Sequence, residues 1–302
     1  MSDDQMARRI REVIAPLRVP PDTRVRLPKD FDPRYKARLA RKKDGAEILQ
    51  RGVELLADQQ AKLAAQRTHG LLVVLQAPDA AGKDGTIRHV MSGVNPQGVH
   101  VHSFKQPSAE ELDHDYLWRY AKGLPARGEI AIFNRSHYEE VLVVRVHPDL
   151  LDRQRIPPSA RQGNMWRRRY REINAWEQHL VGNGFRIVKL FLNVSKEEQR
   201  QRLLQRIDRP DKNWKFSMSD IQERKRWDDY QVAYAGMLSH TSTPWAPWYV
   251  IPADRKWFAR LAASAVIANA LIGIGAQFPT VDAATRRTLK QVRASLEASG
   301  PA

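Results

Sequence analysis

The chain has 302 residues, 42% of them hydrophobic, and its 50 Lys and Arg against 34 Asp and Glu make a net charge of +16. This composition excludes wholesale disorder, and the absence of cysteine excludes disulfides, thiolate zinc sites and iron-sulfur clusters. The first residues, MSDDQMARRI, lack the apolar core of a secretory signal. We therefore expect a folded cytoplasmic protein with no membrane partner.

The order of apolar patterns along the chain predicts an α/β fold. Residues 1–43 are rich in proline and charge without a sustained period, and are expected to form an N-terminal arm. A continuous apolar run, typical of a strand buried on both faces, occurs at 71–75, and further runs at 99–104, 130–133, 187–194 and 248–251 also predict strands. Helical patterns occur at 45–66, 83–91, 109–121, 165–181, 196–207 and 257–274. Strand followed by helix, repeated, predicts a parallel sheet flanked by helices.

We expect a single main domain over residues 44–278, followed by a C-terminal tail at 279–302. The apolar stretch 261–276 contains polar residues and is shorter than the roughly 20 residues that cross a bilayer. It therefore predicts a buried helix.

A candidate phosphate loop follows the first predicted strand. Against the pattern G-x-x-x-x-G-K-[ST], Gly82 and Lys83 match, while Ala77 replaces the first glycine and Asp84 the hydroxyl residue. A small-residue loop that opens a helix directs backbone N–H groups at an anion. Asp79 and Asp84 would repel a bare phosphate, but they are suited to Mg²⁺, with Mn²⁺ as a substitute. The alternative is a generic strand-to-helix turn.

Two further segments carry charge toward this loop. Arg135 follows the predicted strand 130–133 and is placed to contact a transferring phosphoryl group, with a surface arginine as the alternative. Asn134 before it is a weaker metal ligand than aspartate. The basic segment at about 200–226 begins on a helix and passes through Pro210. This layout is typical of a lid that closes over bound phosphates and excludes water.

Four separated segments together resemble the family-2 polyphosphate kinases: 77–88, 133–139, 214–216 and 243–252. The resemblance extends from about residue 30 to 278. It implies a thymidylate-kinase-like P-loop kinase fold with a helical lid, and Mg²⁺-dependent transfer of phosphoryl groups between inorganic polyphosphate and nucleotides. The form with Asn134 resembles the subfamily that acts on both nucleoside mono- and diphosphates (AMP and ADP, or GMP and GDP). Homodimers or homotetramers are also implied.

The resemblance and the loop pattern together give the candidate site residues. Asp79, Lys83 and Arg135 are expected to be catalytic, and Asp79 and Asp84 to bind the metal. The expected phosphate-binding residues are Gly82, Lys83, Asp84, Gly85, Thr86, Arg206, Arg209, Lys212 and Lys215. The expected nucleotide-binding residues are Arg88, Asn134, Glu139 and Arg169.

Two other functions remain open from the residues alone. The loop would also suit a kinase that uses ATP, and the charge of +16 would suit a nucleic-acid-binding P-loop protein. The charge is unevenly distributed, however: residues 71–150 hold 8 basic and 10 acidic side chains, and residues 151–230 hold 19 and 11. A metal-binding loop beside a basic track for polyphosphate explains this asymmetry better, so no specific nucleic-acid partner is expected.

Overall fold

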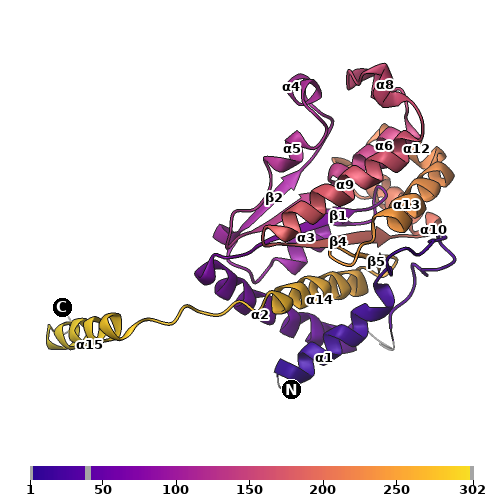
Figure 1. Cartoon of the computed structure of the whole chain (residues 1–302). Coiled ribbons are helices and arrows are strands. Elements are labelled where there is room, and N and C mark those ends of the chain that lie inside the picture. Colours follow the sequence, from indigo (N-terminus) through magenta and orange to yellow (C-terminus); the bar gives the residue numbers. More distant parts are fainter. Residues whose placement is uncertain (1–2, 38–41, 300–302) are drawn as a thin grey trace.

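A five-stranded parallel sheet lies at the centre of the chain (Figure 1). The computed structural model describes residues 3–37 and 42–299. The strands run in the spatial order β2-β3-β1-β4-β5, and every neighbouring pair is parallel. Their bounds are β1 Gly70–Gln76, β2 Val99–Ser103, β3 Ile130–Asn134, β4 Phe185–Asn193 and β5 Trp248–Pro252. The predicted parallel sheet is confirmed.

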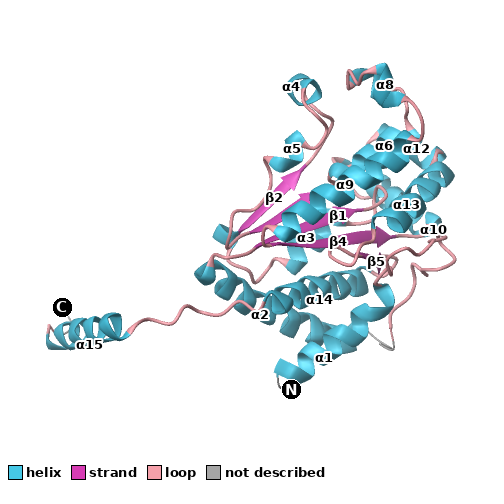
Figure 2. Ribbon diagram, viewed as in Figure 1, coloured by secondary structure: helices cyan, strands magenta, loops and turns pink. Residues whose placement is uncertain are grey.

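Helices cover both faces of the sheet, as Figure 2 shows. In β1, Leu71, Val73 and Leu75 belong to one core cluster, while Leu72 and Val74 belong to another. The first cluster packs under α1 Asp3–Ile14, α2 Lys42–Gln66, α3 Lys83–Val90 and α14 Lys256–Ile274. The second packs under α9 Met165–Gly182 and α13 Trp227–Thr241. Because both faces of β1 are buried, its sequence reads as a continuous apolar run.

Short helices and turns connect these layers. They are η1 Ala15–Leu17, η2 Pro96–Gly98, α4 Ala109–Asp113, α5 Trp118–Ala121, η3 His137–Val141, α6 Val143–Val146, α7 Leu150–Arg153 and α8 Pro158–Arg161. The lid region consists of α10 Lys196–Asp208, α11 Pro210–Asn213 and α12 Met218–Lys225. The tail forms an exposed helix, α15 Ala283–Ala298, which projects away from the body in Figure 1.

The apolar helix α14 is long and apolar enough to cross a membrane by length and composition. Most of it is buried, however, and it packs against α2, α1 and β4. Twelve of its residues, including Phe258 and Leu261, are buried. The prediction of a buried core helix is confirmed.

The N-terminal segment differs from the prediction of an irregular arm. Residues 3–14 form α1, and its side chains Met6, Ile10 and Ile14 are buried in the same core cluster as α14. Their spacing of four residues places them on one face of the helix. Further along, the backbone N–H of Val19 donates to the Trp248 carbonyl at 2.9 Å. The prediction of an arm is therefore corrected for these residues, which are part of the packed domain.

The helix predicted over 109–121 is also corrected, because the structure has α4 and α5 instead. The backbone of His114 is extended, with φ −103° and ψ 170°. The Asp115 carboxylate then accepts a hydrogen bond from the Leu117 N–H at 2.9 Å. Asp favours such local turns over helix interiors, so the helical pattern is interrupted here.

Candidate active site

The phosphate loop spans residues 77–82, between the end of β1 and the first turn of α3. Gly82 has φ +104°, in the left-handed region that favours glycine, and Ala80 has φ +61°. The Lys83 ammonium donates to the Ala77 carbonyl at 3.2 Å, so its side chain folds back over the loop. The Thr86 hydroxyl donates to the Gly82 carbonyl at 3.1 Å. The loop and the start of α3 together offer backbone N–H groups and one ammonium to an anion.

Arg135 lies beside this loop because β3 is the neighbour of β1. Its guanidinium Nη2 is 3.2 Å from Asp79 Oδ1. Its backbone has φ +64°, and its N–H donates to the Leu75 carbonyl at 3.1 Å. The structure thus brings the predicted Asp79, Lys83 and Arg135 together at the carboxyl ends of two adjacent strands, where α/β sheets bind their ligands.

Glu139 completes this charged group from η3. Its negative charge, followed by that of Asp79, raises the pKa of Arg135 against the effect of burial. Burial lowers the pKa of Lys83, whereas Asp79 and Glu139 act in the opposite direction. Burial raises the pKa of Glu139, and Arg135 and Lys83 offset part of that rise. The site therefore holds two cations and two carboxylates in a partly buried environment: Lys83, Arg135, Asp79 and Glu139.

Asn134 and Asp84 form a second polar pair at the same edge. The Asn134 amide donates to Asp84 Oδ1 at 3.0 Å and to the Ser103 hydroxyl at 3.3 Å. Its Oδ1 atom is buried without a hydrogen-bond partner. In the part of the chain that the structure describes, no group of three or more His, Cys, Asp or Glu is arranged to hold a metal ion. A cation here would have few protein ligands, all oxygens, as Mg²⁺ commonly does beside phosphates.

The lid covers the loop and encloses a cavity with it. The cavity measures about 220 Å³ and is lined by Asp79, Arg135 and Glu139 on one side and by Asp220 and Arg224 of the lid on the other. Burial and the nearby Asp79 raise the pKa of Asp220. The predicted lid therefore faces the predicted loop.

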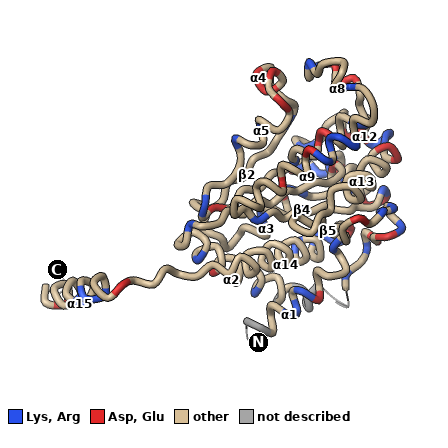
Figure 3. The backbone as a smooth tube through the Cα atoms, viewed as in Figure 1, with Lys and Arg blue, Asp and Glu red and all other residues tan. Residues whose placement is uncertain are grey.

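The predicted lid cations are not equally free to bind phosphate. Arg206 forms an ion pair with Asp220, and Arg209 binds Asp211 through two contacts of 3.0 and 2.8 Å. Lys215 lies 4.8 Å from the centre of the exposed Trp214 ring. Figure 3 shows acidic residues among the basic ones around α12, in keeping with this pairing. The lid charge is thus partly neutralised within the lid itself.

The predicted nucleotide-binding residues are separated in the structure. Asn134 and Glu139 lie at the site, but Arg88 is on the exposed side of α3, next to Arg260 of α14. Arg169 is buried, and it donates to Glu140 Oε2 at 2.8 Å and to Gln154 Oε1 at 2.6 Å. Arg169 is therefore held by Glu140 away from the loop, and it lines a pocket beyond Glu140.

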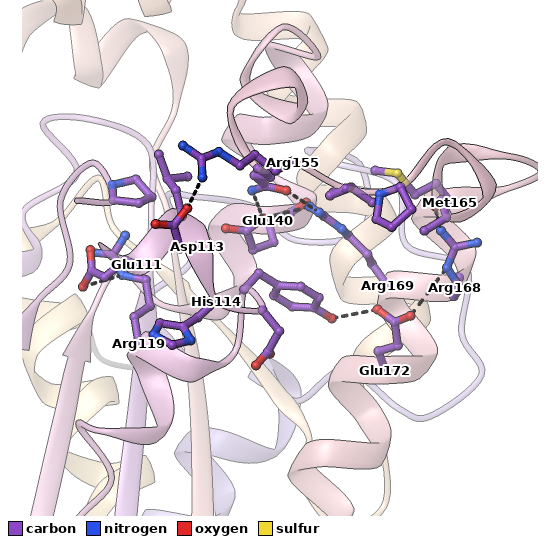
Figure 4. Close-up of a pocket in the computed structure, with 18 residues that line it drawn as sticks. Glu111, Asp113, His114, Arg119, Glu140, Arg155, Met165, Arg168, Arg169 and Glu172 are labelled. Carbon is purple, nitrogen blue, oxygen red and sulfur yellow. Dashed lines mark hydrogen bonds and ion pairs between the residues drawn. The ribbon is translucent and has the colours of Figure 1, made fainter. Parts of the chain in front are cut away.

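A groove extends from the loop toward α4 and α8. A cavity of about 390 Å³ shares Arg135 and Glu139 with the first cavity. It shares Arg119 and Glu140 with a third, of about 460 Å³, drawn in Figure 4. Figure 4 shows Arg119 beside Glu111 and Arg169 directed at Glu140. The three cavities therefore adjoin one another in a line from the loop to the far pocket.

Two residues of α10 that hold the loop were not predicted. Gln199 donates to the Asp79 carbonyl at 3.1 Å, and Arg202 donates to the Ala81 carbonyl at 2.6 Å. Both are buried. Their spacing of three residues, with Leu203 next to them, is a sequence signal for an inward-facing side of α10. The prediction of a lid over the basic run did not separate this inward-facing side from the exposed one.

The raised pKa of Glu139 predicts a pH dependence of activity. The Glu139 carboxyl stays protonated to a higher pH than an ordinary glutamic acid. As the pH falls, it therefore loses its negative charge, and with it the attraction for Arg135, earlier than an ordinary glutamate would. We expect kcat to rise with pH through this raised pKa, and the rise to be absent in Glu139→Gln. Profiles of kcat for both proteins at saturating substrate check this, since substrate ionisation affects both equally. Superimposable profiles would contradict it.

The family model described as "Polyphosphate kinase 2 (PPK2)" matches residues 38–274. An "ADP-polyphosphate phosphotransferase" of Rhodopseudomonas palustris is 52% identical over 270 residues, covering 89% of this chain and 92% of that protein. An "AMP/ADP-polyphosphate phosphotransferase" of Meiothermus ruber is 46% identical over 274 residues, covering 89% and 97%. The crystal structure of polyphosphate kinase 2 from Arthrobacter aurescens TC1 has a TM-score of 0.81 and 40% identity, covering 90% of this chain and 94% of that one.

Proposed function

The chain belongs to the polyphosphate kinase 2 family, and from this premise we propose that it transfers phosphoryl groups between inorganic polyphosphate and nucleotides at the loop of residues 77–86. The observation that carries the site assignment is the meeting of Asp79, Lys83 and Arg135 at the adjoining ends of β1 and β3. Family membership supports the activity, and the geometry supports the assignment of these three residues to the site.

The site residues position the reacting groups and neutralise their charge. The loop N–H groups and Lys83 bind the terminal phosphates of the donor, and Arg135 contacts the phosphoryl group in transfer. An oxygen of the acceptor nucleotide's terminal phosphate attacks the phosphorus in line, a new P–O bond forms, and the bond to the bridging oxygen of the donor breaks. The shortened polyphosphate leaves with the electron pair. No covalent enzyme intermediate is required, because alignment and charge neutralisation lower the barrier.

The oxygen atoms at the site suit Mg²⁺ or Mn²⁺. Asp84, the unpartnered Asn134 Oδ1 and Asp79 would hold the ion. When bound, such an ion would supply positive charge that neutralises the phosphates. Asp79 and Asp84 are then compatible with an anionic substrate that they would otherwise repel.

A row of cations beside the loop suits the polyphosphate donor. Lys212, Lys256 and Arg260 form no ion pair with another described residue. A Cβ atom built on Gly85 would lie 4.0 Å from Arg260 Nη2, so Arg260 is next to the first turn of α3. Burial lowers the pKa of Lys256, and the positive charges of Arg202 and Lys212 lower it further. Such concentrated positive charge attracts a polyanion.

The groove on the other side of Arg135 suits the nucleotide acceptor. Its cavities continue from Glu139 to the pocket of Figure 4. The name of one relative includes ADP and that of the other includes AMP and ADP, which supports nucleoside mono- and diphosphates as acceptors.

We also propose that the protein is cytoplasmic and forms a homodimer or homotetramer. We propose no specific nucleic-acid partner.

An activity panel tests the function. Polyphosphate and ATP as donors are each incubated with AMP, ADP, GMP and GDP, and the nucleotide products are separated by chromatography. We expect products with polyphosphate, loss of activity in excess chelator, and recovery on adding Mg²⁺ or Mn²⁺. Products with ATP and none with polyphosphate would instead make the protein an ATP-dependent kinase. Activity that persists in the chelator would contradict the metal assignment.

A further inference from the structure

The inward-facing side of α10 joins lid helix α12 to the phosphate loop. Gln199 and Arg202 lie on this side and are 3% and 5% exposed, although both side chains are polar. Buried polar groups in proteins are almost always hydrogen-bonded. The partners of these two side chains therefore indicate what they hold in place.

The Gln199 side-chain amide bridges two parts of the site. Its Nε2 donates to the Asp79 carbonyl at 3.1 Å. Its Oε1 accepts a hydrogen bond from Arg224 Nη1 at 2.6 Å. Arg224 belongs to the lid helix α12 and also donates to the Lys196 carbonyl at 2.9 Å. The Gln199 amide thus connects lid helix α12 to the backbone of Asp79, the residue that pairs with Arg135.

Arg202 holds the next part of the loop. Its Nη1 donates to the Ala81 carbonyl at 2.6 Å and to the Ala80 carbonyl at 3.3 Å. Its Nη2 donates to the Ala253 carbonyl at 2.5 Å, just after β5. The loop carbonyls at 80 and 81 are therefore fixed by α10 to the segment after β5. The Asp79 carbonyl, by contrast, is connected through Gln199 to a side chain of α12.

We propose that Gln199 is a positioning residue that couples the placement of lid helix α12 to the placement of Asp79 in the phosphate loop. The proposal rests on the proposed function of that loop. Asp220 and Arg224 of α12 line the same cavity as Asp79 and Arg135, so lid and loop are opposite walls of one space. Because Gln199 contacts both walls, lid placement is transmitted to the Asp79 backbone and hence to the carboxylate that pairs with Arg135.

The first test removes the bridge and keeps the side chain's size. In Gln199→Leu we expect kcat to fall about tenfold to a hundredfold, as misplacement of a reacting group by about 1 Å can do, with the nucleotide KM changed less than about threefold. The matched control is Gln201→Leu. Gln201 is two residues away on the exposed side of α10 and contacts only Glu197, at 2.8 Å. This control should keep the wild-type kcat. A normal kcat in Gln199→Leu would overturn the proposal.

The second test asks whether Gln199 and Arg224 act as one unit. We expect Arg224→Ala to lower kcat, and the double variant Gln199→Leu/Arg224→Ala to be little worse than the more impaired single variant. Multiplicative losses in the double variant would show that the two side chains act separately and would overturn the coupling. Wild-type activity with polyphosphate is measured in the same experiment. Its absence would be a failure of the proposed function, whereas an active wild type with multiplicative losses would be a failure of this inference alone.

A second substitution keeps the proposal testable if Gln199→Leu does not fold. Gln199→Glu retains an oxygen for Arg224 but has no N–H for the Asp79 carbonyl. Its charge is placed against Arg224, which neutralises it. We expect the same loss of kcat with an unchanged nucleotide KM and a thermal unfolding midpoint near that of the wild type. Full activity in this variant would show that the hydrogen bond to Asp79 has no role in the reaction.

Discussion

Replacing Lys83 with alanine will lower kcat for polyphosphate-dependent phosphorylation by about a hundredfold to a thousandfold, the usual effect of removing one preorganised group that stabilises transition-state charge. The Lys83 ammonium lies over the loop, bonded to the Ala77 carbonyl at 3.2 Å. Burial lowers the pKa of Lys83, and the attraction of Asp79 and Glu139 opposes that effect. Without this ammonium, the donor phosphates would have only backbone N–H groups at that point of the loop. Steady-state rates with polyphosphate and ADP check the prediction.

The fold should be little affected by this substitution. Lys83 makes one hydrogen bond to the loop, and Asp79 keeps its ion pair with Arg135. We therefore expect the thermal unfolding midpoint to stay within about 4 °C, the shift that about 1 kcal/mol produces in a large domain. The control is Lys62→Ala, which removes a lysine paired with Asp58 on α2, away from the site. A Lys83→Ala variant with more than a third of wild-type kcat would contradict the catalytic assignment.

Most of the sheet could be predicted from the sequence because β1, β3, β4 and β5 are largely buried, whereas the edge strand β2 is mostly exposed. Buried strands are continuous apolar runs, and each ends where the run ends. The spatial order of the strands could not be predicted in the same way. It depends on which edges pair, and β1 pairs with β3 and β4, whose sequences lie far along the chain. Helix α1 was missed because proline and charge farther along residues 1–43 obscured the spacing of Met6, Ile10 and Ile14.

The phosphate loop could be predicted because it is a local feature, a short segment between a strand and a helix. The contacts of Asp79 with Arg135 and of Asp84 with Asn134 join residues 56 and 50 positions apart. These contacts follow from the pairing of β1 with β3, which belongs to the tertiary structure. The partners of Arg169 and Gln199 could not be predicted, because sequence alone does not distinguish a buried polar side chain from an exposed one. Burial and partners decide their functions.

A buried ion pair behind the site supports η3, and breaking this pair is expected to lower the stability of the domain. Lys189 lies in the middle of β4 and is 0% exposed. Its ammonium donates to Glu177 Oε2 at 2.6 Å, to the Tyr138 hydroxyl at 2.9 Å and to the Thr241 carbonyl at 2.6 Å. Tyr138 precedes Glu139 in η3, so this cluster holds the segment that carries the site carboxylate. Burial lowers the pKa of Lys189, and Glu177 opposes that effect.

Replacing Lys189 with methionine should lower the free energy of unfolding by about 3–5 kcal/mol, because the buried Glu177 carboxylate loses the ammonium that balances its charge and keeps only its contacts with Tyr138 and His137. Urea denaturation measures this value. The double variant Lys189→Met/Glu177→Gln removes the orphaned charge and should recover part of the loss, which distinguishes an uncompensated charge from a simple packing defect. Lys62→Met breaks an exposed ion pair of the same type and should cost less than about 1 kcal/mol. A loss in Lys189→Met as small as that of Lys62→Met would mean that the buried pair contributes nothing to the stability of the domain.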